Sequence, residues 1–160
     1  MNGLDRLRFA ADEMLGSLAK WLRIMGYDTT YDKGLADREI AQRAKADNRV
    51  LLTRDKELAR DDEGSLYIIS DVLDEQVRQV DSAFHLDFSQ GLTRCAICNG
   101  RLEEVPKAEV ESEVPPRSLQ MADTFYRCSG CGKVYWKGTH WNNILKRVQE
   151  FGVQDRSLEK

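Results

Sequence analysis

Apolar residues in the first ninety positions follow two patterns in turn. Short apolar runs stop abruptly at polar or charged residues, at 7–11, 27–31, 49–53 and 65–70. Runs of this kind are typical of strands buried on both faces of a parallel sheet. The segments between and after them show helical spacing, which predicts helices over 14–25, from 37 and over 74–84. The highly charged segment 55–62 fits a short helix or a loop. The alternation predicts an α/β fold, with a small parallel sheet flanked by helices on both faces.

The composition changes near residue 90. All three prolines and all four cysteines lie beyond this point. We therefore expect a first domain over 1–90 and a second domain over 91–160. In the second domain we predict short strands at 109–114, 125–127 and 134–136. A final amphipathic helix would bury one side, formed by Trp141, Ile144, Leu145 and Val148.

The four cysteines form two pairs of identical spacing, Cys95-x-x-Cys98 and Cys128-x-x-Cys131. Two such pairs can supply four thiolates to one tetrahedral zinc ion, which leaves no open position for catalysis. Turn-forming residues adjoin both pairs: Asn99, Gly100, Gly130 and Gly132. The spacing predicts a structural zinc in a C-terminal zinc ribbon, with disulfides or redox chemistry as the alternative. Such ribbons dock nucleic acid or protein, or only stabilise a small fold.

Three carboxylates are candidates for a second metal site. Asp12 and Asp55 each follow a predicted strand, and Asp37 opens a predicted helix beyond the second strand. In open α/β sheets, sites form at the carboxyl ends of the strands. Acids gathered there would repel one another unless Mg²⁺ or Mn²⁺ lay between them, and such ions support phosphodiester hydrolysis. Each aspartate could instead only cap a helix. Glu13 could be a further ligand or plain polar surface.

Several basic residues are candidates for binding a phosphate backbone. Lys20 and Arg23 lie three apart on the first predicted helix, and Arg54 follows Thr53 at the end of a strand. Lys137 and His140 belong to an aromatic stretch at 135–141 that could stack bases and contact phosphate. The alternatives are solvated helix faces, an exposed charge at Arg54, and a helix start with packed tryptophans at 135–141.

Composition and charge limit the possible classes of protein. The chain has 160 residues, of which 41% are hydrophobic and 32% charged, as in a soluble globular protein. The net charge of −3 and the lack of a polybasic block mean that any nucleic-acid contact must be local. No apolar run reaches the roughly 20 residues needed to span a bilayer, and no signal-peptide pattern is present, so we expect a cytoplasmic protein.

These motifs together resemble the mutator-seven C-terminal RNase domain family. The resemblance covers about residues 7–145 and rests on Asp12-Glu13-Met14-Leu15-Gly16, Trp21-Leu22-Arg23, Gly26-Tyr27-Asp28, Leu52-Thr53-Arg54-Asp55, the two cysteine pairs, and Tyr135-Trp136 to His140-Trp141. It implies a PIN-like nuclease fold with an appended zinc ribbon, and metal-dependent ribonuclease chemistry at Asp12, Asp37 and Asp55. RNA would be the substrate, with the ribosome or tRNA as further candidate partners. Many PIN nucleases have a fourth acid, for which this sequence offers Asp61, Asp62 and Asp71.

Two other functions fit parts of the pattern. A phosphoacceptor receiver domain also carries an acidic pair after its first strand and an aspartate after its third, as Asp12, Glu13 and Asp55 do. Against it, no clear lysine ends a fifth parallel strand. A non-catalytic RNA- or ribosome-binding module could keep the ribbon with an inactive acidic pocket. We rank the metal-dependent ribonuclease first, the binding module second and the receiver third.

Overall fold

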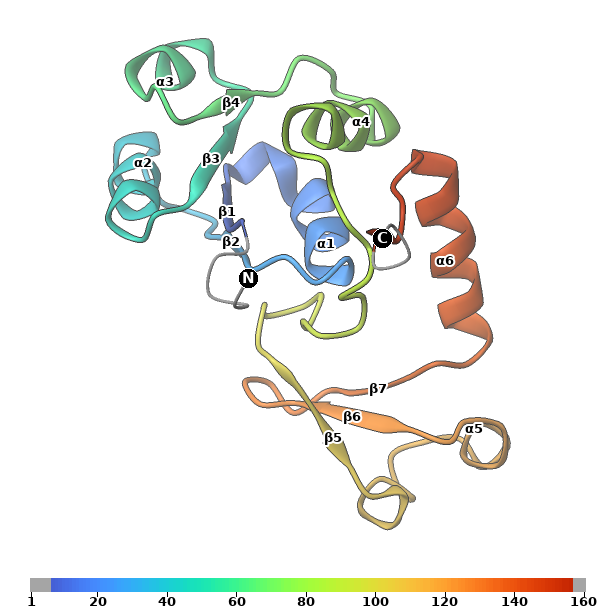
Figure 1. Ribbon diagram of the computed structural model, residues 1–160. Helices are drawn as coiled ribbons and strands as arrows, with labels where there is room; N and C mark the ends of the chain where they lie inside the picture. The colour runs from blue at the N-terminus through green and yellow to red at the C-terminus, as the bar shows by residue number, and fades with distance from the viewer. Residues whose placement is uncertain (1–6, 157–160) are drawn as a thin grey trace.

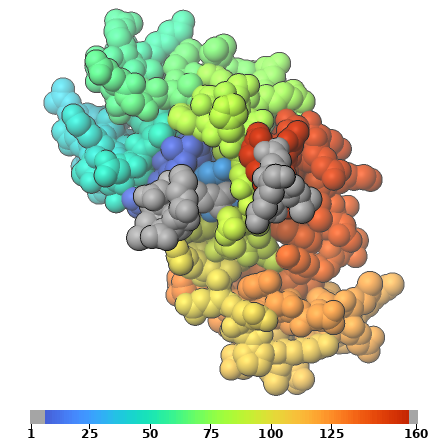
Figure 2. All heavy atoms as spheres, in the orientation of Figure 1, coloured from blue at the N-terminus to red at the C-terminus, as the bar shows by residue number. Residues whose placement is uncertain are grey.

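The computed structural model describes residues 7–156. It shows an α/β part that holds the N-terminal half, a small antiparallel sheet below it, and a long C-terminal helix that returns alongside the α/β part (Figure 1). In the space-filling view, the antiparallel sheet and its loops form a separate lobe, with the C-terminal helix along one side (Figure 2).

The α/β part is built on a four-stranded parallel sheet, as predicted. Its strands lie in the order β2-β1-β3-β4. Their bounds are β1 Phe9–Ala11, β2 Thr29–Tyr31, β3 Val50–Thr53 and β4 Leu66–Tyr67. The last strand is shorter than the apolar run at 65–70, because the chain leaves the sheet after Ile68. The N–H of Ile69 donates to the side chain of Gln79 at 3.0 Å, and its carbonyl accepts from Arg54 at 3.0 Å.

Helices cover both faces of this sheet, which confirms the predicted α/β fold. The elements are η2 Glu13–Leu15, α1 Gly16–Ile24, α2 Asp37–Ala46, α3 Lys56–Asp61 and α4 Leu73–Phe84. Side chains alternate across the strands. Phe9 and Leu52 join the main core with α1 and α4, whereas Ala10 and Leu51 pack against Ile40 of α2 on the opposite face. The apolar strand sequences follow from this burial on two sides.

The first predicted helix, over 14–25, is divided in two. A 3-10 turn precedes α1 because the Asp12 side chain accepts the N–H of Met14 at 2.9 Å and tightens the chain there. Leu15 then leaves the helical region, with φ −109° and ψ 36°, before α1 begins.

The second sheet is antiparallel, in the order β5-β6-β7. Its strands are β5 Leu102–Val105, β6 Phe125–Cys128 and β7 Val134–Trp136, and the loop between β5 and β6 carries η3 Lys107–Glu109 and α5 Pro116–Met121. The strand predicted at 109–114 is wrong. Val110 and Val114 lie on consecutive turns, with the N–H of Val114 donating to the carbonyl of Val110, and both are buried against Phe125. Apolar residues four apart fitted this turn better than a strand.

The last helix, α6 Thr139–Phe151, packs on the core of the α/β part. Its Trp141 stacks on Phe88 with ring centroids 5.7 Å apart, and Phe151 meets Trp21 edge-on at 5.2 Å. Figure 1 shows α6 beside α4, which Arg147 contacts through an ion pair to Asp74. The main core therefore includes residues from both sides of position 90, although the division of the chain at that position stays a prediction.

Candidate functional site

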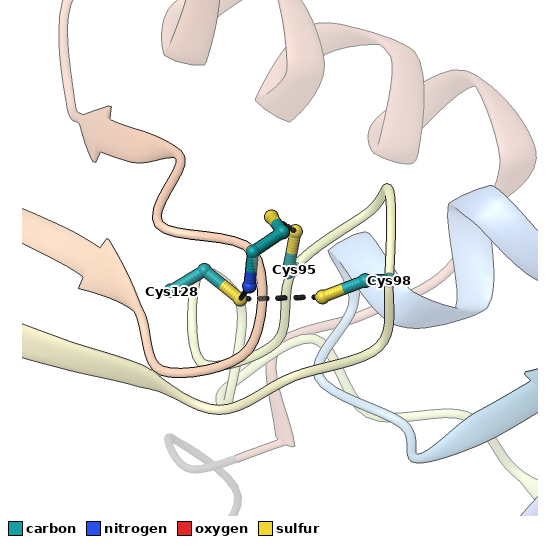
Figure 3. Close-up of side chains that lie close together, drawn as sticks. Cys95, Cys98 and Cys128 are labelled. Carbon is teal, nitrogen blue, oxygen red and sulfur yellow. Dashed lines mark hydrogen bonds between the residues drawn. The ribbon is translucent and has the colours of Figure 1, made fainter.

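The four cysteines converge at one point where the loop before β5 meets the β6–β7 turn (Figure 3). Their sulfur atoms all lie within 4.8 Å of one another. Cys98 and Cys128 are 3.3 Å apart at sulfur, and Cys95 and Cys131 are 3.7 Å apart. A tetrahedral zinc with Zn–S bonds of about 2.3 Å places sulfurs about 3.8 Å apart. The cluster therefore fits a metal ion such as zinc, as the spacing predicted.

The turn residues beside the cysteines have the conformations that such a cluster needs. Asn99 and Gly132, each directly after a second cysteine, have φ of 70° and 81°, where glycine and asparagine are favoured. A Cβ on Gly100 would lie 2.7 Å from the sulfur of Cys128. Glycine at this position is therefore required by the close approach of two sulfur-bearing turns.

The thiols are too crowded to ionise independently. The N–H of Gly100 lowers the pKa of Cys98, but burial and hydrogen bonds with the other three thiols outweigh it and raise this pKa to about 12. Burial raises the pKa of Cys128, but the N–H groups of Cys131 and Gly130 outweigh it and lower this pKa to about 7. A zinc ion would remove the conflict, because it binds cysteines as thiolates.

Tyr135 lies against this cluster and was not predicted to do so. Its hydroxyl accepts the N–H of Ala96 at 3.3 Å and lies 3.0 Å from the sulfur of Cys95. Burial and then the Cys95 thiol raise the pKa of Tyr135, so its hydroxyl keeps its proton and can donate it to a Cys95 thiolate. In the sequence, Tyr135 belongs to the stretch 135–141, which fits either a base-stacking loop or a helix start with packed tryptophans. Its place in a strand that leaves the second cysteine pair was the available signal.

Arg23 joins the first cysteine turn to the parallel sheet. Only 8% of its surface is exposed, and its guanidinium donates to the carbonyls of Thr29, Ala96 and Ile97 at 2.9, 3.2 and 3.2 Å. We expected this arginine to contact a phosphate backbone. The structure instead places it beneath the cysteine turn, where burial lowers its pKa although nearby Cys95 acts in the opposite direction.

Asp28 strengthens the same junction. Its carboxylate accepts from Arg49 and from the side chain of Asn99, both at 2.7 Å, while Asn99 accepts the N–H of Thr29. Burial opposes ionisation of Asp28, but these hydrogen bonds and the charges of Arg49 and Arg94 lower its pKa to about 2. Gly26-Tyr27-Asp28 is one of the motifs that carry the family resemblance, and its Asp28 connects the parallel sheet to the first cysteine turn.

At the opposite, carboxyl edge of the sheet, Asp12 is buried and firmly held. One of its oxygens accepts the N–H of Met14, and the other accepts the Thr53 hydroxyl at 2.7 Å and the N–H of Arg54 at 2.8 Å. The Thr53 hydroxyl also accepts the N–H of Asp55 at 3.0 Å, so its own proton points to Asp12. Thr53 thus orients Asp12, a role that the sequence did not indicate.

Asp37 and Asp55 lie close together at this edge. Asp55 caps α3 by accepting the N–H groups of Glu57 and Leu58, which lower its pKa. Asp37 does not cap α2, whose N-cap is Ala36, so the capping alternative fails at this residue. Partial removal from water, and then the carboxylates of Asp55, Asp12 and Glu13, raise the pKa of Asp37.

The three aspartates are more loosely arranged than the cysteines. Within residues 7–156, only the four cysteines form a group of potential ligands with all ligand atoms within 4.8 Å of one another. Asp12, Asp37 and Asp55 nonetheless share one edge, because β1 and β3 are adjacent parallel strands and α2 begins beside their carboxyl ends. The carboxylates of Asp55 and Asp12 add there to the effect of partial removal from water, and together these raise the pKa of Asp37.

The remaining predicted binding residues lie in different places. Arg54 directs its guanidinium to the carbonyls of Ile68 and Ile69, at 3.3 and 3.0 Å. Lys20, Lys137 and His140 are exposed. Trp141, which directly follows His140, is buried, as expected for a helix start with packed tryptophans.

These features define the class of the molecule: an α/β protein with a parallel sheet, an acidic carboxyl edge and an appended four-cysteine ribbon. Its sequence matches the family model described as the Mut7-C RNAse domain over residues 7–148. The chain therefore belongs to the Mut7-C RNase domain family, which confirms the resemblance and indicates a nuclease-related function on RNA. No curated protein and no solved structure matches the chain significantly. In the part of the chain that the structure describes, no helix is both long and apolar enough to cross a membrane.

Proposed function

We propose that the protein is a metal-dependent ribonuclease that hydrolyses RNA phosphodiester bonds at the acidic edge, with Asp12, Asp37 and Asp55 binding Mg²⁺ or Mn²⁺. The observation that carries this proposal is the position of these acids at one edge of the sheet, where partial removal from water and then the neighbouring carboxylates raise the pKa of Asp37. Oxygen ligands of this kind suit Mg²⁺ and Mn²⁺. Membership of the RNase domain family supports RNA as the substrate.

The chain's own groups hold the carboxylates in place for this role. Thr53 and the N–H of Arg54 fix one oxygen of Asp12, and two N–H groups at the start of α3 fix one oxygen of Asp55. Asp37 is exposed, and its side chain meets that of Asp55 and is not fixed by the backbone of the described residues, so it can adjust to a cation. A bound Mg²⁺ or Mn²⁺ would supply Lewis acidity and a more acidic water.

The topology favours Asp71 as the fourth acid. Asp71 follows β4, which is parallel to β3, so it leaves the sheet at the same edge as Asp12 and Asp55. Asp61 and Asp62 come at the end of α3, just before β4 begins, which places them toward the opposite edge. We therefore propose Asp71 as the further ligand.

The proposed RNA-binding residues are Lys20, Lys137 and His140, which are exposed. These residues offer few contacts to phosphate, so RNA affinity would depend only modestly on salt concentration. Each contact with a single strand contributes roughly 0.7 to the slope of log affinity against log salt concentration. The four cysteines would hold a structural zinc that maintains the ribbon for RNA or partner docking.

The test is cleavage of a panel of RNAs, including tRNA and ribosomal RNA, by the wild type, Asp55→Asn and a control, Asp123→Asn. Asp123 is an exposed acid on the ribbon, between α5 and β6. We expect Mn²⁺-dependent cleavage that Asp55→Asn reduces by at least about 100-fold and Asp123→Asn leaves unchanged. Cleavage that persists in EDTA, or in Asp55→Asn, would contradict the proposed site.

The rival functions predict other results. RNA binding without cleavage in Mg²⁺ and Mn²⁺ would favour a non-catalytic RNA- or ribosome-binding module. A phosphoacceptor receiver would be labelled by acetyl phosphate. The receiver is disfavoured because, over residues 7–156, the parallel sheet has four strands and the chain then continues into the ribbon.

A further inference from the structure

A groove of about 370 Å³ lies between α2 and the edge strand β2. Helix α2 packs mainly on β1 and β3, so the outermost strand of the sheet is left without a helix on this face. Thr29 points into the main core and is fully buried, whereas Thr30 faces the groove and is half-buried. The groove therefore exists because the sheet is wider than the helix that covers it.

Small and apolar side chains form the floor. Ala10 of β1, Ala44 of α2 and Ile40 lie at the base of the groove and are almost wholly buried, and the two small alanines leave space that larger side chains would fill. The volume falls within the range of sites that bind small molecules, about 300–1,000 Å³. A flat ring or a sugar could lie on such a floor.

The walls carry two charged groups that have no partner among the described residues. The guanidinium of Arg43, exposed on α2, makes no hydrogen bond or ion pair with them. The carboxylate of Asp32, directly after β2, likewise accepts no hydrogen bond from them. The other charged residues of the groove, Asp47 and Arg49, are paired with each other at 2.6 Å. Among residues 7–156, the groove thus presents the cation of Arg43 and the anion of Asp32 without hydrogen-bonded partners, above small buried side chains.

The groove is continuous with the acidic edge of the sheet. Ala11, which lines it, is followed directly by Asp12, and Asp32 ends the neighbouring strand at the same edge. A chain whose phosphodiester lay at Asp12 could therefore extend its next nucleotide along α2.

We infer that this groove binds one unpaired nucleotide of a single RNA strand, next to the phosphodiester at the acidic edge. This inference rests on the proposed ribonuclease function. Arg43 meets the backbone phosphate, the base or sugar occupies the space between α2 and β2, and Asp32 accepts a hydrogen bond from a ribose 2′-hydroxyl. Deoxyribose has no such donor, so Asp32 contributes to the choice of RNA over DNA.

The first test measures binding of a single-stranded RNA over a range of salt concentrations. All proteins carry Asp55→Asn, so that binding is read whether or not the wild type cleaves RNA. Arg43→Gln is compared with Lys45→Gln, which removes an exposed charge from the same helix outside the groove lining. We expect Arg43→Gln to reduce the logarithmic salt slope by about 0.7, the value of one phosphate contact, and Lys45→Gln to leave it unchanged.

The second test fills the groove and removes its anion. Ala46 is exposed and lines the groove, so Ala46→Trp would occupy it without disturbing the core, and Ala83→Trp is the control at an exposed position of α4. We expect Ala46→Trp to weaken RNA binding at least about five-fold, as loss of roughly one hydrogen bond or more would do. Asp32→Ala should lower the ratio of RNA to DNA affinity by a similar factor.

Equal affinities and salt slopes for Arg43→Gln and Lys45→Gln, with Ala46→Trp binding like Ala83→Trp, would overturn the inference. If those differences appear but the wild type cleaves no RNA, the groove is an RNA site and the proposed catalysis fails. If the wild type cleaves RNA but the groove variants bind normally, the proposed function stands and the groove assignment is wrong.

Discussion

Several single residues in this protein act by orienting another side chain. The Thr53 hydroxyl accepts one N–H and donates to Asp12, which fixes the direction of its proton. The Tyr135 hydroxyl accepts the N–H of Ala96 and lies 3.0 Å from the sulfur of Cys95, to which it can donate once Cys95 is a thiolate. Partners of metal ligands raise the affinity for the metal because they fix the ligand and stabilise its charged form.

Replacement of Tyr135 by phenylalanine should weaken zinc binding by about 10–100-fold, because the Cys95 thiolate loses its hydroxyl donor. The measurement is a competition for zinc with a chromophoric chelator. Tyr126→Phe is the matched control, since Tyr126 lies opposite Tyr135 in the same sheet and its hydroxyl makes no hydrogen bond with the described residues. Equal zinc affinities of the two variants would show that the hydroxyl does not support the ligand.

At the scale of elements, the two edges of the parallel sheet have different roles. The carboxyl ends of β1 and β3 and the start of α2 bring three acids together, and partial removal from water and then these carboxylates raise the pKa of Asp37. The opposite edge pairs Asp28 with Arg49 and Asn99, and this lowers the pKa of Asp28 to about 2. Carboxylates thus repel one another at the edge proposed for catalysis, whereas oppositely charged and hydrogen-bonding groups attract one another at the edge that holds the ribbon.

In EDTA, the Asp37→Asn variant should melt at a higher temperature than the wild type at pH 7. A carboxyl whose pKa is raised in the folded state binds its proton more tightly there than in the unfolded chain. Its contribution to stability is therefore lost as the pH rises above the ordinary value of 3.8 and through the raised pKa. Asparagine carries no charge and avoids this loss, so the two melting temperatures should converge near pH 4.

Mn²⁺ should reverse this order, because a cation bound by the native state stabilises the wild type more than the variant. The measurement is a set of melting curves at pH 4–8 in EDTA and in Mn²⁺, with Asp123→Asn as the control. Asp55→Asn should change the metal-free melting temperature little, because asparagine can cap α3 in its place. Identical responses to Mn²⁺ in all these proteins would argue against the three-carboxylate site.

At the scale of the whole molecule, the ribbon is held to the α/β part by polar contacts of its first cysteine turn, by packing of Leu102, Tyr126 and Tyr135 on the main core, and by α6. The first cysteine turn is bound to β2 through Arg23, Asp28 and Asn99. Helix α6 returns from the ribbon and buries Trp141 and Phe151 in the main core. Zinc at the cysteines would therefore stabilise more than the small sheet that contains it.

The Cys128→Ser variant should lose its zinc and the structure of β5, β6 and β7, because a structural zinc supplies about 10–16 kcal/mol of binding free energy that folds its own site. The parallel sheet, which has its own core, should stay folded. Elemental analysis should find one zinc per wild-type chain, and hydrogen exchange should show lost protection over 95–136 with retained protection in β1 and β3. A wild type without zinc, or a variant with full protection, would contradict this expectation.

The sequence alone determined those features that depend on neighbouring residues. Burial on both faces makes a strand apolar throughout, so the parallel sheet could be predicted from the apolar run at 49–53 and the similar runs at 7–11, 27–31 and 65–70. The spacing of the cysteine pairs specified a four-sulfur cluster, because ligand geometry demands it. The carboxylates after β1 and β3 could be placed at one edge, because all carboxyl ends of a parallel sheet lie there.

Only the tertiary structure decided which distant groups meet. Arg23 has the appearance of a surface charge in the sequence, but its three carbonyl partners come from segments up to 74 residues away. The apolar positions at 109–114 suited a strand until the turn that buries Val110 and Val114 was known. The contact between Tyr135 and Cys95 depends on where β7 lies relative to the first cysteine turn. The groove beside β2 depends on how much of the sheet α2 covers. Local patterns fix an element's type and its buried side, whereas partners across 40 to 70 residues are set by packing of the whole chain.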